Sequence, residues 1–134
     1  MFKKITIPLL LLMISLLLIS CKESLPNKNY EDFPHIDHWN DTLNFSDETI
    51  VFYYSPYCEI CQAIQDEATE YLVILEEKGY PVYMIHEGMI YEQGTPPRDI
   101  IETPSILVYK NKELDEMISG SKPILNYLSN KSEN

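Results

Sequence analysis

The segment Tyr53–Gln62, YYSPYCEICQ, carries two cysteines separated by two residues, where two sequence patterns meet. Residues 49–55, TIVFYYS, are rich in β-branched and aromatic side chains, which predicts a buried strand ending at Pro56. From Cys61 to Leu75 apolar residues recur at helical spacing, which predicts a helix. The cysteine pair therefore lies where a strand passes directly into the start of a helix.

The two cysteines are predicted to have different environments. Cys58 falls at the helix N-terminus, where unpaired backbone N–H groups and the positive end of the helix dipole stabilise a thiolate. Cys61 lies one turn further on and faces the core. We therefore expect Cys58 to be the attacking sulfur and Cys61 to resolve a mixed disulfide.

The rest of the chain alternates strands and helices. Gly79, followed by Pro81, is predicted to end the first long helix. Residues 88–103 form a predicted loop with one helical turn near 98–101, and Asn111–Lys112 a tight turn of a β-hairpin. The further predicted elements are strands at 81–86, 105–109 and 113–119 and a helix at 122–129. This order predicts an α/β sandwich with a mixed sheet.

Upstream of the first strand the signals are weaker. Ile36, Trp39 and Leu43 have the spacing of a short amphipathic helix with its apolar face inward. The same region also offers a further strand around Phe33.

The cysteine pair has two other interpretations. Zinc needs two more ligands, and the chain has no second Cys-x-x-Cys. The cluster His35, Asp37 and His38 falls in the predicted first helix and is typical of a polar surface. A structural disulfide closing a four-residue loop contributes only roughly 2 kcal/mol in the chain-entropy model. Exchange chemistry explains the pair better than either, and no metal is predicted.

The N-terminus has the features of a secretion signal. Lys3 and Lys4 precede an almost unbroken apolar run, Ile5–Ile19. Leu-Ile-Ser-Cys, ending at Cys21, resembles a bacterial lipobox, and that resemblance implies a signal peptide over 1–20 and a lipid on Cys21. The alternatives are an uncleaved anchor or an ordinary signal peptide. Each of the three places the domain outside the cytoplasm, and the polar residues 21–32 are predicted to be a flexible tether.

The charge excludes some partners. The chain has 10 basic and 21 acidic residues; removal of 1–20 takes two of the basic ones, leaving 8 − 21 = −13. This balance argues against nucleic-acid binding, which needs basic patches. It also disfavours electrostatic adhesion to anionic lipid, so the predicted membrane attachment is the lipid itself.

The combined pattern resembles the thioredoxin superfamily. Tyr-Cys-Glu-Ile-Cys follows a hydrophobic strand, and Thr103–Pro104 precedes the strand SILVY, its hairpin, Gly120 and a closing helix. The resemblance implies a thioredoxin-like three-layer sandwich over 33–134, with a central mixed sheet, a C-terminal hairpin and flanking helices. It implies a nucleophile and a resolving thiol at Cys58 and Cys61, a cis-proline at Pro104, and substrate contacts from Tyr57, Thr103 and Pro104.

The sequence also departs from that family. Cytoplasmic thioredoxins carry a buried aspartate six residues before the first cysteine, where this chain has Phe52, and the Gly-Pro dipeptide between the cysteines is absent. Proton transfer at Cys61 is therefore expected to be slower, or to use water or another carboxylate. Glu59 competes for the positive helix end and repels a thiolate at Cys58, which disfavours the thiolate and predicts a reductant.

The predicted function is that of a lipid-anchored, extracytoplasmic thiol–disulfide oxidoreductase of the bacterial cell envelope, acting on protein disulfides as a reductase without a cofactor. Such an enzyme needs an electron donor, for which a membrane thiol transporter is expected. Two alternatives remain. One is an oxidase, isomerase or export accessory of the same fold, and the other is a redox-inactive binding module that uses the groove beside Pro104.

Overall fold

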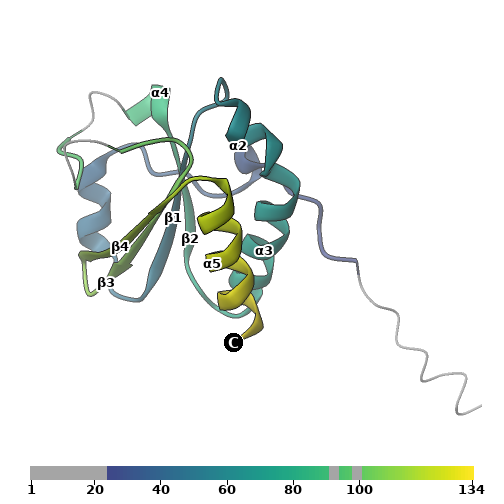
Figure 1. Cartoon of the computed structure of the whole chain (residues 1–134). Coiled ribbons are helices and arrows are strands. Elements are labelled where there is room, and N and C mark those ends of the chain that lie inside the picture. Colours follow the sequence, from purple (N-terminus) through teal and green to yellow (C-terminus); the bar gives the residue numbers. More distant parts are fainter. Residues whose placement is uncertain (1–23, 91–93, 98–100) are drawn as a thin grey trace, which may run out of the picture.

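The computed structural model describes residues 24–90, 94–97 and 101–134 (Figure 1). The predicted signal peptide, Cys21 and most of the helical turn predicted at 98–101 lie outside these residues. Within the described part, no helix is long and apolar enough to cross a membrane.

A four-stranded mixed sheet, in the order β2-β1-β3-β4, forms the centre of the domain. Strand β1 (Thr49–Tyr54) pairs in parallel with β2 (Val82–His86) and antiparallel with β3 (Ser105–Lys110). Strand β4 (Glu113–Ser119) pairs antiparallel with β3. All six residues of β1 are buried, because this central strand is covered on both faces. The predicted α/β fold with a mixed sheet is confirmed.

The turn of the β3–β4 hairpin has the expected conformation. Asn111 and Lys112 have φ angles of 51° and 70°, as in the type I′ turn that suits a two-residue hairpin loop. Lys110 therefore pairs with Glu113, which fixes the register at the end of the sheet.

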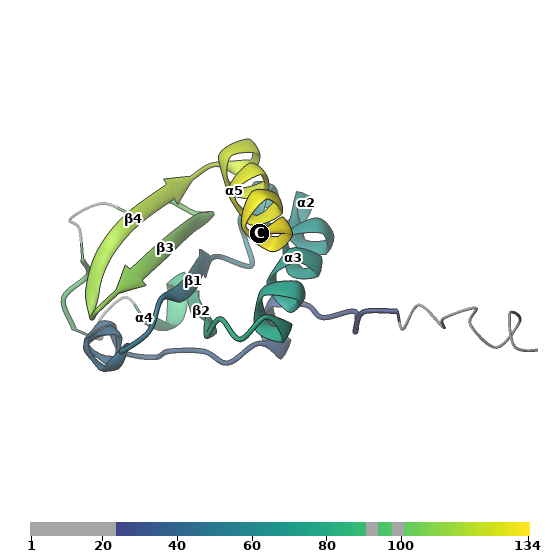
Figure 2. The same cartoon turned by 90° about the horizontal axis from the view of Figure 1, so that it is seen from below.

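Helices cover the sheet on both sides (Figures 1 and 2). On one face, α3 (Gln65–Glu77) and α5 (Ser121–Glu133) lie side by side and pack on a core that includes alternate β1 residues such as Phe52. The opposite face carries the 3-10 helix η2 (Trp39–Asn44), with a second core around Trp39, and the short helix α4 (Glu87–Ile90).

The ends of α3 show where the sequence prediction was right and where it was wrong. Gly79 has a φ of +92°, and the N–H of Tyr80 donates to the Leu75 carbonyl at 3.0 Å, so the helix ends in a Schellman motif. The helix stop predicted at Gly79 is confirmed. The helix predicted to run unbroken from the cysteines is instead two helices. The short α2 (Glu59–Ala63) is separated from α3 at Ile64, where φ is −100° and ψ is 0°.

Two further predictions need correction. The amphipathic helix expected from Ile36 to Leu43 is the 3-10 helix η2, which starts later, and Leu43 is 58% exposed rather than inward. The loop predicted from residue 88 overlaps α4, whose Ile90 is buried. Around the weakly predicted strand at Phe33 there is only an isolated parallel bridge between His35 and Met84.

The last residues of the predicted tether pack against the domain. Tyr30 opens the 3-10 turn η1 (Tyr30–Asp32) and is only 3% exposed, within the core under α3. Lys28 pairs with Glu76 of α3 at 2.6 Å, and Leu25 is partly buried against the same core. The folded unit therefore begins before residue 33, because one tyrosine anchors an otherwise polar segment.

Candidate active site

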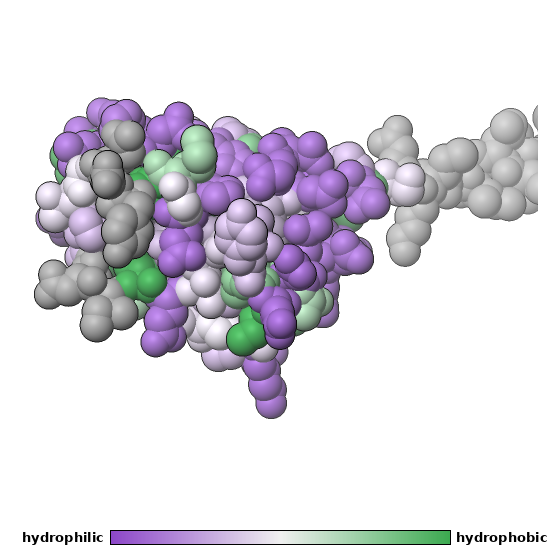
Figure 3. All heavy atoms as spheres, turned by 90° about the horizontal axis from the view of Figure 1, so that it is seen from above, coloured by the Kyte–Doolittle hydropathy of each residue, from purple (hydrophilic) through white to green (hydrophobic). Residues whose placement is uncertain are grey.

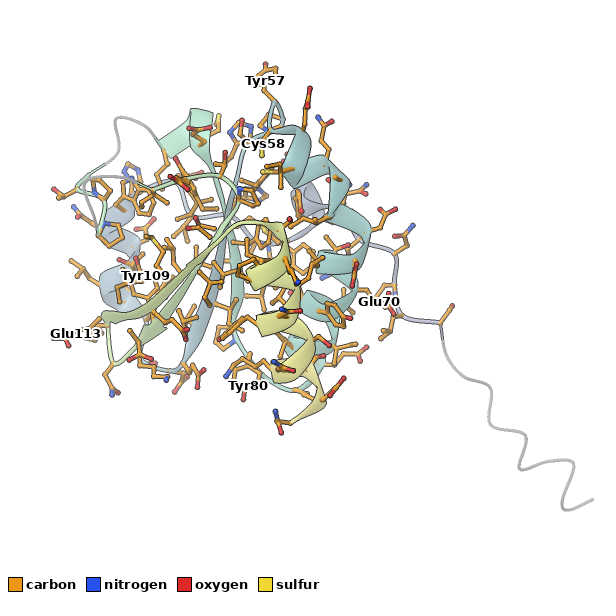
Figure 4. All side chains as sticks on the ribbon, viewed as in Figure 1. Tyr57, Cys58, Glu70, Tyr80, Tyr109 and Glu113 are labelled. Carbon is orange, nitrogen blue, oxygen red and sulfur yellow. The ribbon has the colours of Figure 1, made fainter. Side chains whose placement is uncertain are left out.

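Cys58 lies at the start of α2, at the tip of the loop that follows β1 (Figure 4). It is the N-cap residue, with extended backbone angles, and its Sγ accepts a hydrogen bond from the N–H of Cys61 at 3.1 Å. N-cap acceptors satisfy helix N–H groups that otherwise lack partners. The predicted position of this sulfur at the helix N-terminus is confirmed, and the residue is partly exposed.

Cys61 is buried, whereas Cys58 is partly exposed. Both are free thiols, but Cys61 is only 1% exposed. Burial raises the pKa of the Cys61 thiol to about 12, and its contact with Cys58 adds to that effect. An attacking role for Cys61 therefore requires a group that takes its proton.

The Thr103–Pro104 segment reaches the cysteines from the far side of the chain. The peptide bond between these two residues is cis, as predicted. The Thr103 carbonyl lies 3.7 Å from the Cys58 sulfur, which donates its S–H to that oxygen. The Pro104 carbonyl accepts the N–H of Gly120 at 3.2 Å, so the segment is tied to the start of α5. The fold thus brings together Cys58, Cys61 and the predicted proline segment.

The two other predicted site residues lie on the open side. Tyr57 is 91% exposed and points away from the body of the molecule (Figure 4). Glu59 is exposed as the first residue of α2, where an acidic side chain interacts with the helix dipole. Figure 3 views this end of the molecule and shows hydrophilic residues over most of it, with small apolar areas between them.

A small cavity beside Cys61 is lined by several residues that were not predicted as site residues. It has a volume of about 150 Å³ and is lined by Tyr30, Glu31, Tyr54, Ser55, Pro56, Cys61, Gln62 and Gln65. The Tyr30 hydroxyl donates to the Cys61 carbonyl at 2.8 Å, and its ring stacks on Phe52 with centroids 4.9 Å apart. The alternation of β1 was a usable signal, because Phe52 and Tyr54 must share a sheet face.

A hydrogen-bonded row of side chains borders this cavity. The Tyr54 hydroxyl donates to Glu31 Oε1 at 2.6 Å and lies 2.8 Å from His35 Nε2. His35 Nδ1 is 2.8 Å from the carbonyl oxygen of Phe33. His35 was predicted to be a polar surface residue, but it is partly buried in this row, whereas Asp37 and His38 are exposed. Among the residues that the structure describes, no group of three metal-ligating side chains is close enough to hold an ion.

Neither protein-family models nor curated protein sequences give a match to this chain. Solved structures do. A thioredoxin from Malassezia sympodialis superposes with a TM-score of 0.61 at 11% identity, over 83% of this chain and 98% of that one. The chain has a thioredoxin-like fold. Mitochondrial thioredoxin 3 from Saccharomyces cerevisiae gives 0.57 at 14% identity, over 79% and 98%. Thioredoxin from Trypanosoma brucei brucei gives 0.57 at 10%, over 87% and 100%.

The TM-scores show a common fold for this chain and the thioredoxins, at identities of 10–14%. Within that fold, the Cys58–Cys61 pair at the start of α2 consists of two free thiols.

Proposed function

We propose that this protein is a membrane-anchored thiol–disulfide oxidoreductase that reduces protein disulfides outside the bacterial cytoplasm. The observation that carries the proposal is the unequal pair of thiols. A partly exposed Cys58 sulfur caps α2 beside the Thr103 carbonyl, and a buried Cys61 lies one turn behind it. This arrangement suits two successive displacements by different sulfurs.

In the first displacement Cys58, as a thiolate, attacks one sulfur of a substrate disulfide, and the other substrate sulfur leaves as a thiolate. The product is a mixed disulfide on Cys58. In the second, Cys61 loses its proton and attacks the Cys58 sulfur, and the remaining substrate sulfur leaves with the bonding electron pair. The dithiol is oxidised to a disulfide by two electrons, and the substrate gains them as two thiols. The proposed substrate contacts are Tyr57, which precedes Cys58 in the chain, Thr103, whose carbonyl lies 3.7 Å from the Cys58 sulfur, and Pro104.

Glu59 supports the reducing direction. The helix N-terminus favours a negative charge, and the carboxylate of this exposed first residue already occupies that region. A thiolate on Cys58 therefore gains less from the helix than it would beside a neutral residue. The less the reduced form is stabilised, the lower the reduction potential and the stronger the reductant.

The direction is tested by equilibrating the full chain, in detergent micelles, with graded ratios of reduced and oxidised dithiothreitol or glutathione and counting free thiols. We expect a potential near or below the thioredoxin value of about −270 mV. The matched variant Glu59→Gln should have a less negative potential. A value near −120 mV, that of a strong oxidant, would refute the reductase and support the oxidase alternative.

The activity is tested by insulin reduction. The full chain with an excess of dithiothreitol should accelerate insulin precipitation, and Cys58→Ser should not. An inactive native chain whose Cys58→Ser variant binds partner proteins equally well would instead identify a redox-inactive binding module.

The anchor and the location form a separate part of the proposal. A lipid on Cys21 would hold the domain at the outer face of a membrane, and a membrane thiol transporter would return electrons to the Cys58–Cys61 disulfide. Labelled palmitate should be incorporated into the expressed chain and not into Cys21→Ser. Labelling that persists in this variant would contradict the lipobox interpretation.

A further inference from the structure

The second displacement raises a problem that the Cys58–Cys61 pair does not solve by itself. Cys61 is a neutral thiol with a strongly raised pKa, enclosed in the core. The neighbouring β1 position, where a carboxylate would be useful, is Phe52, which is fully buried and stacks on Tyr30. The proton acceptor for Cys61 is therefore water or a group from another part of the chain.

The cavity beside Cys61 is one place where such a group could lie. Glu31 is the only carboxylate among its lining residues, and it comes from η1 in the N-terminal segment rather than from the sheet. A volume of about 150 Å³ is larger than the share of about 30 Å³ that one water occupies in the liquid, and the lining supplies polar partners. Cys61 and Glu31 both line this cavity, and the Glu31 side chain, 66% exposed, also reaches solvent, so water here can lie between the two residues.

The row Glu31–Tyr54–His35 fixes the position of the Glu31 carboxylate. The Tyr54 hydroxyl donates to Glu31 Oε1 at 2.6 Å and lies 2.8 Å from His35 Nε2. His35 Nδ1 lies 2.8 Å from the Phe33 carbonyl oxygen, so the row is tied to the backbone.

We propose that Glu31, held by Tyr54 and His35, accepts the Cys61 proton through water in the cavity during release of the reduced substrate. This inference rests on the proposed function and adds a residue to its second step. As the Cys61 proton passes to Glu31, a bond forms between the Cys61 and Cys58 sulfurs. The bond from Cys58 to the substrate sulfur breaks, and that sulfur leaves with the electron pair and is protonated by solvent.

Several other groups face this site and enter its pH dependence. Glu31 Oε2 lies 3.7 Å from His35 Nε2, and the His86 ring packs edge-on against Tyr54 with centroids 5.4 Å apart. Burial is the main cause of the raised pKa of Tyr30. The two cysteines and Asp66 of α3 raise this pKa further through electrostatic interaction. The charged and titratable groups around the cavity are therefore Tyr30, Glu31, His35, Tyr54, Cys58, Cys61, Asp66 and His86.

The test separates the two displacements with 5,5′-dithiobis(2-nitrobenzoate) as the disulfide. The reduced full chain, in detergent micelles and in excess over the reagent, is mixed in a stopped-flow instrument, and released thionitrobenzoate is followed by absorbance. The first release reports attack by Cys58, and the second reports displacement by Cys61. Glu31→Gln keeps an oxygen acceptor for the Tyr54 hydroxyl but cannot take a proton.

We expect Glu31→Gln to slow the second release by at least about tenfold near neutral pH and to leave the first within about twofold, since general bases contribute about 10²–10⁴-fold. The second release should then rise with pH in the variant more steeply than in the native chain. The matched control is Glu67→Gln, because Glu67 is exposed on α3 and does not line the cavity. It should behave as the native chain does.

An equal second release in Glu31→Gln and the native chain would overturn the role of Glu31 and leave the proposed function standing. Absence of the first release from the native chain would overturn the proposed function itself. If circular dichroism shows that Glu31→Gln is unfolded, the second release is measured instead in Glu31→Ala with added acetate. Recovery of the second release by acetate supports the proposal, and no recovery overturns it.

Discussion

Tyr30 anchors the N-terminal segment, and its removal should destabilise the whole domain. The side chain is 3% exposed, and its hydroxyl donates to the Cys61 carbonyl. The centroid of its ring lies 4.9 Å from the ring centroids of both Phe52 and Tyr54. A buried aromatic covers about 150–250 Å², which at about 25 cal/mol per Å² corresponds to about 4–6 kcal/mol as an upper bound. We expect Tyr30→Ala to lower the free energy of unfolding by about 3–5 kcal/mol.

The hydroxyl contribution can be measured separately. Tyr30→Phe keeps the ring contacts and removes one buried hydrogen bond, which should cost about 1–2 kcal/mol. The assay is urea unfolding of the reduced full chain, followed by fluorescence of Trp39, the single tryptophan, which is 5% exposed. Tyr57→Ala is the matched control, because that tyrosine is 91% exposed, and its effect should stay within about 0.5 kcal/mol.

The outcome decides where the folded unit begins. If Tyr30→Ala costs less than about 1 kcal/mol, residues 24–32 are not part of the cooperative unit, because deletion of a buried aromatic from a packed core costs more. The cavity that Glu31 lines would then not be a stable feature of the domain either.

Three further predictions concern single positions. Iodoacetamide should modify Cys58 in the reduced folded chain and leave Cys61 until urea is added, because Cys61 is 1% exposed; equal labelling by mass spectrometry would contradict its burial. Folding raises the pKa of Cys61 from 9.0 to about 12, so its contribution to stability is complete below pH 9 and is lost towards pH 12. The urea midpoint of the native chain should therefore fall faster between pH 9 and pH 12 than the midpoint of Cys61→Ala. This variant is the control because it retains every titrating tyrosine. Parallel plots of midpoint against pH would refute the raised pKa of Cys61. Lys112→Gly should raise stability by about 0.5–1 kcal/mol in urea unfolding, since Lys112 has a φ of 70°, and a loss of stability would show that its side chain contributes contacts.

Much of the fold could be predicted because its signals are local. The strand pattern of TIVFYYS, the helix stop at Gly79 and the Asn111–Lys112 turn each depend on a few neighbouring residues, and each is found where it was expected. The Cys58 and Pro104 neighbourhood was predictable for another reason. A motif at a helix start and a proline before a strand resemble a known arrangement that joins segments far apart in the sequence.

The errors share a cause in tertiary contacts. Lys22–Asp32 is polar, and composition alone cannot show that one tyrosine in it fits between β1 and α3. No proline or glycine signals the break between the two helices at Ile64. The spacing of Leu43 suits an α-helix with an inward apolar face, but in the 3-10 helix η2 this side chain is exposed. Glu31 and His35 were missed as partners of Tyr54 because nothing in their own sequence neighbourhoods relates them to a strand residue about twenty positions away.

Phe52 connects these observations. An aspartate at that position would place a charge directly in the strand, whereas the phenylalanine offers a flat apolar surface on which the Tyr30 ring stacks. That stacking brings the N-terminal segment against β1, and the next residue along the segment is Glu31, at the cavity that reaches Cys61. The apolar side chain at position 52 and the ordering of the N-terminal segment are thus one structural arrangement. If Glu31 accepts the Cys61 proton, Phe52→Asp should supply a second proton acceptor inside the sheet and make the second thionitrobenzoate release insensitive to Glu31→Gln. A double variant as slow as Glu31→Gln alone would show that the two positions do not share this role.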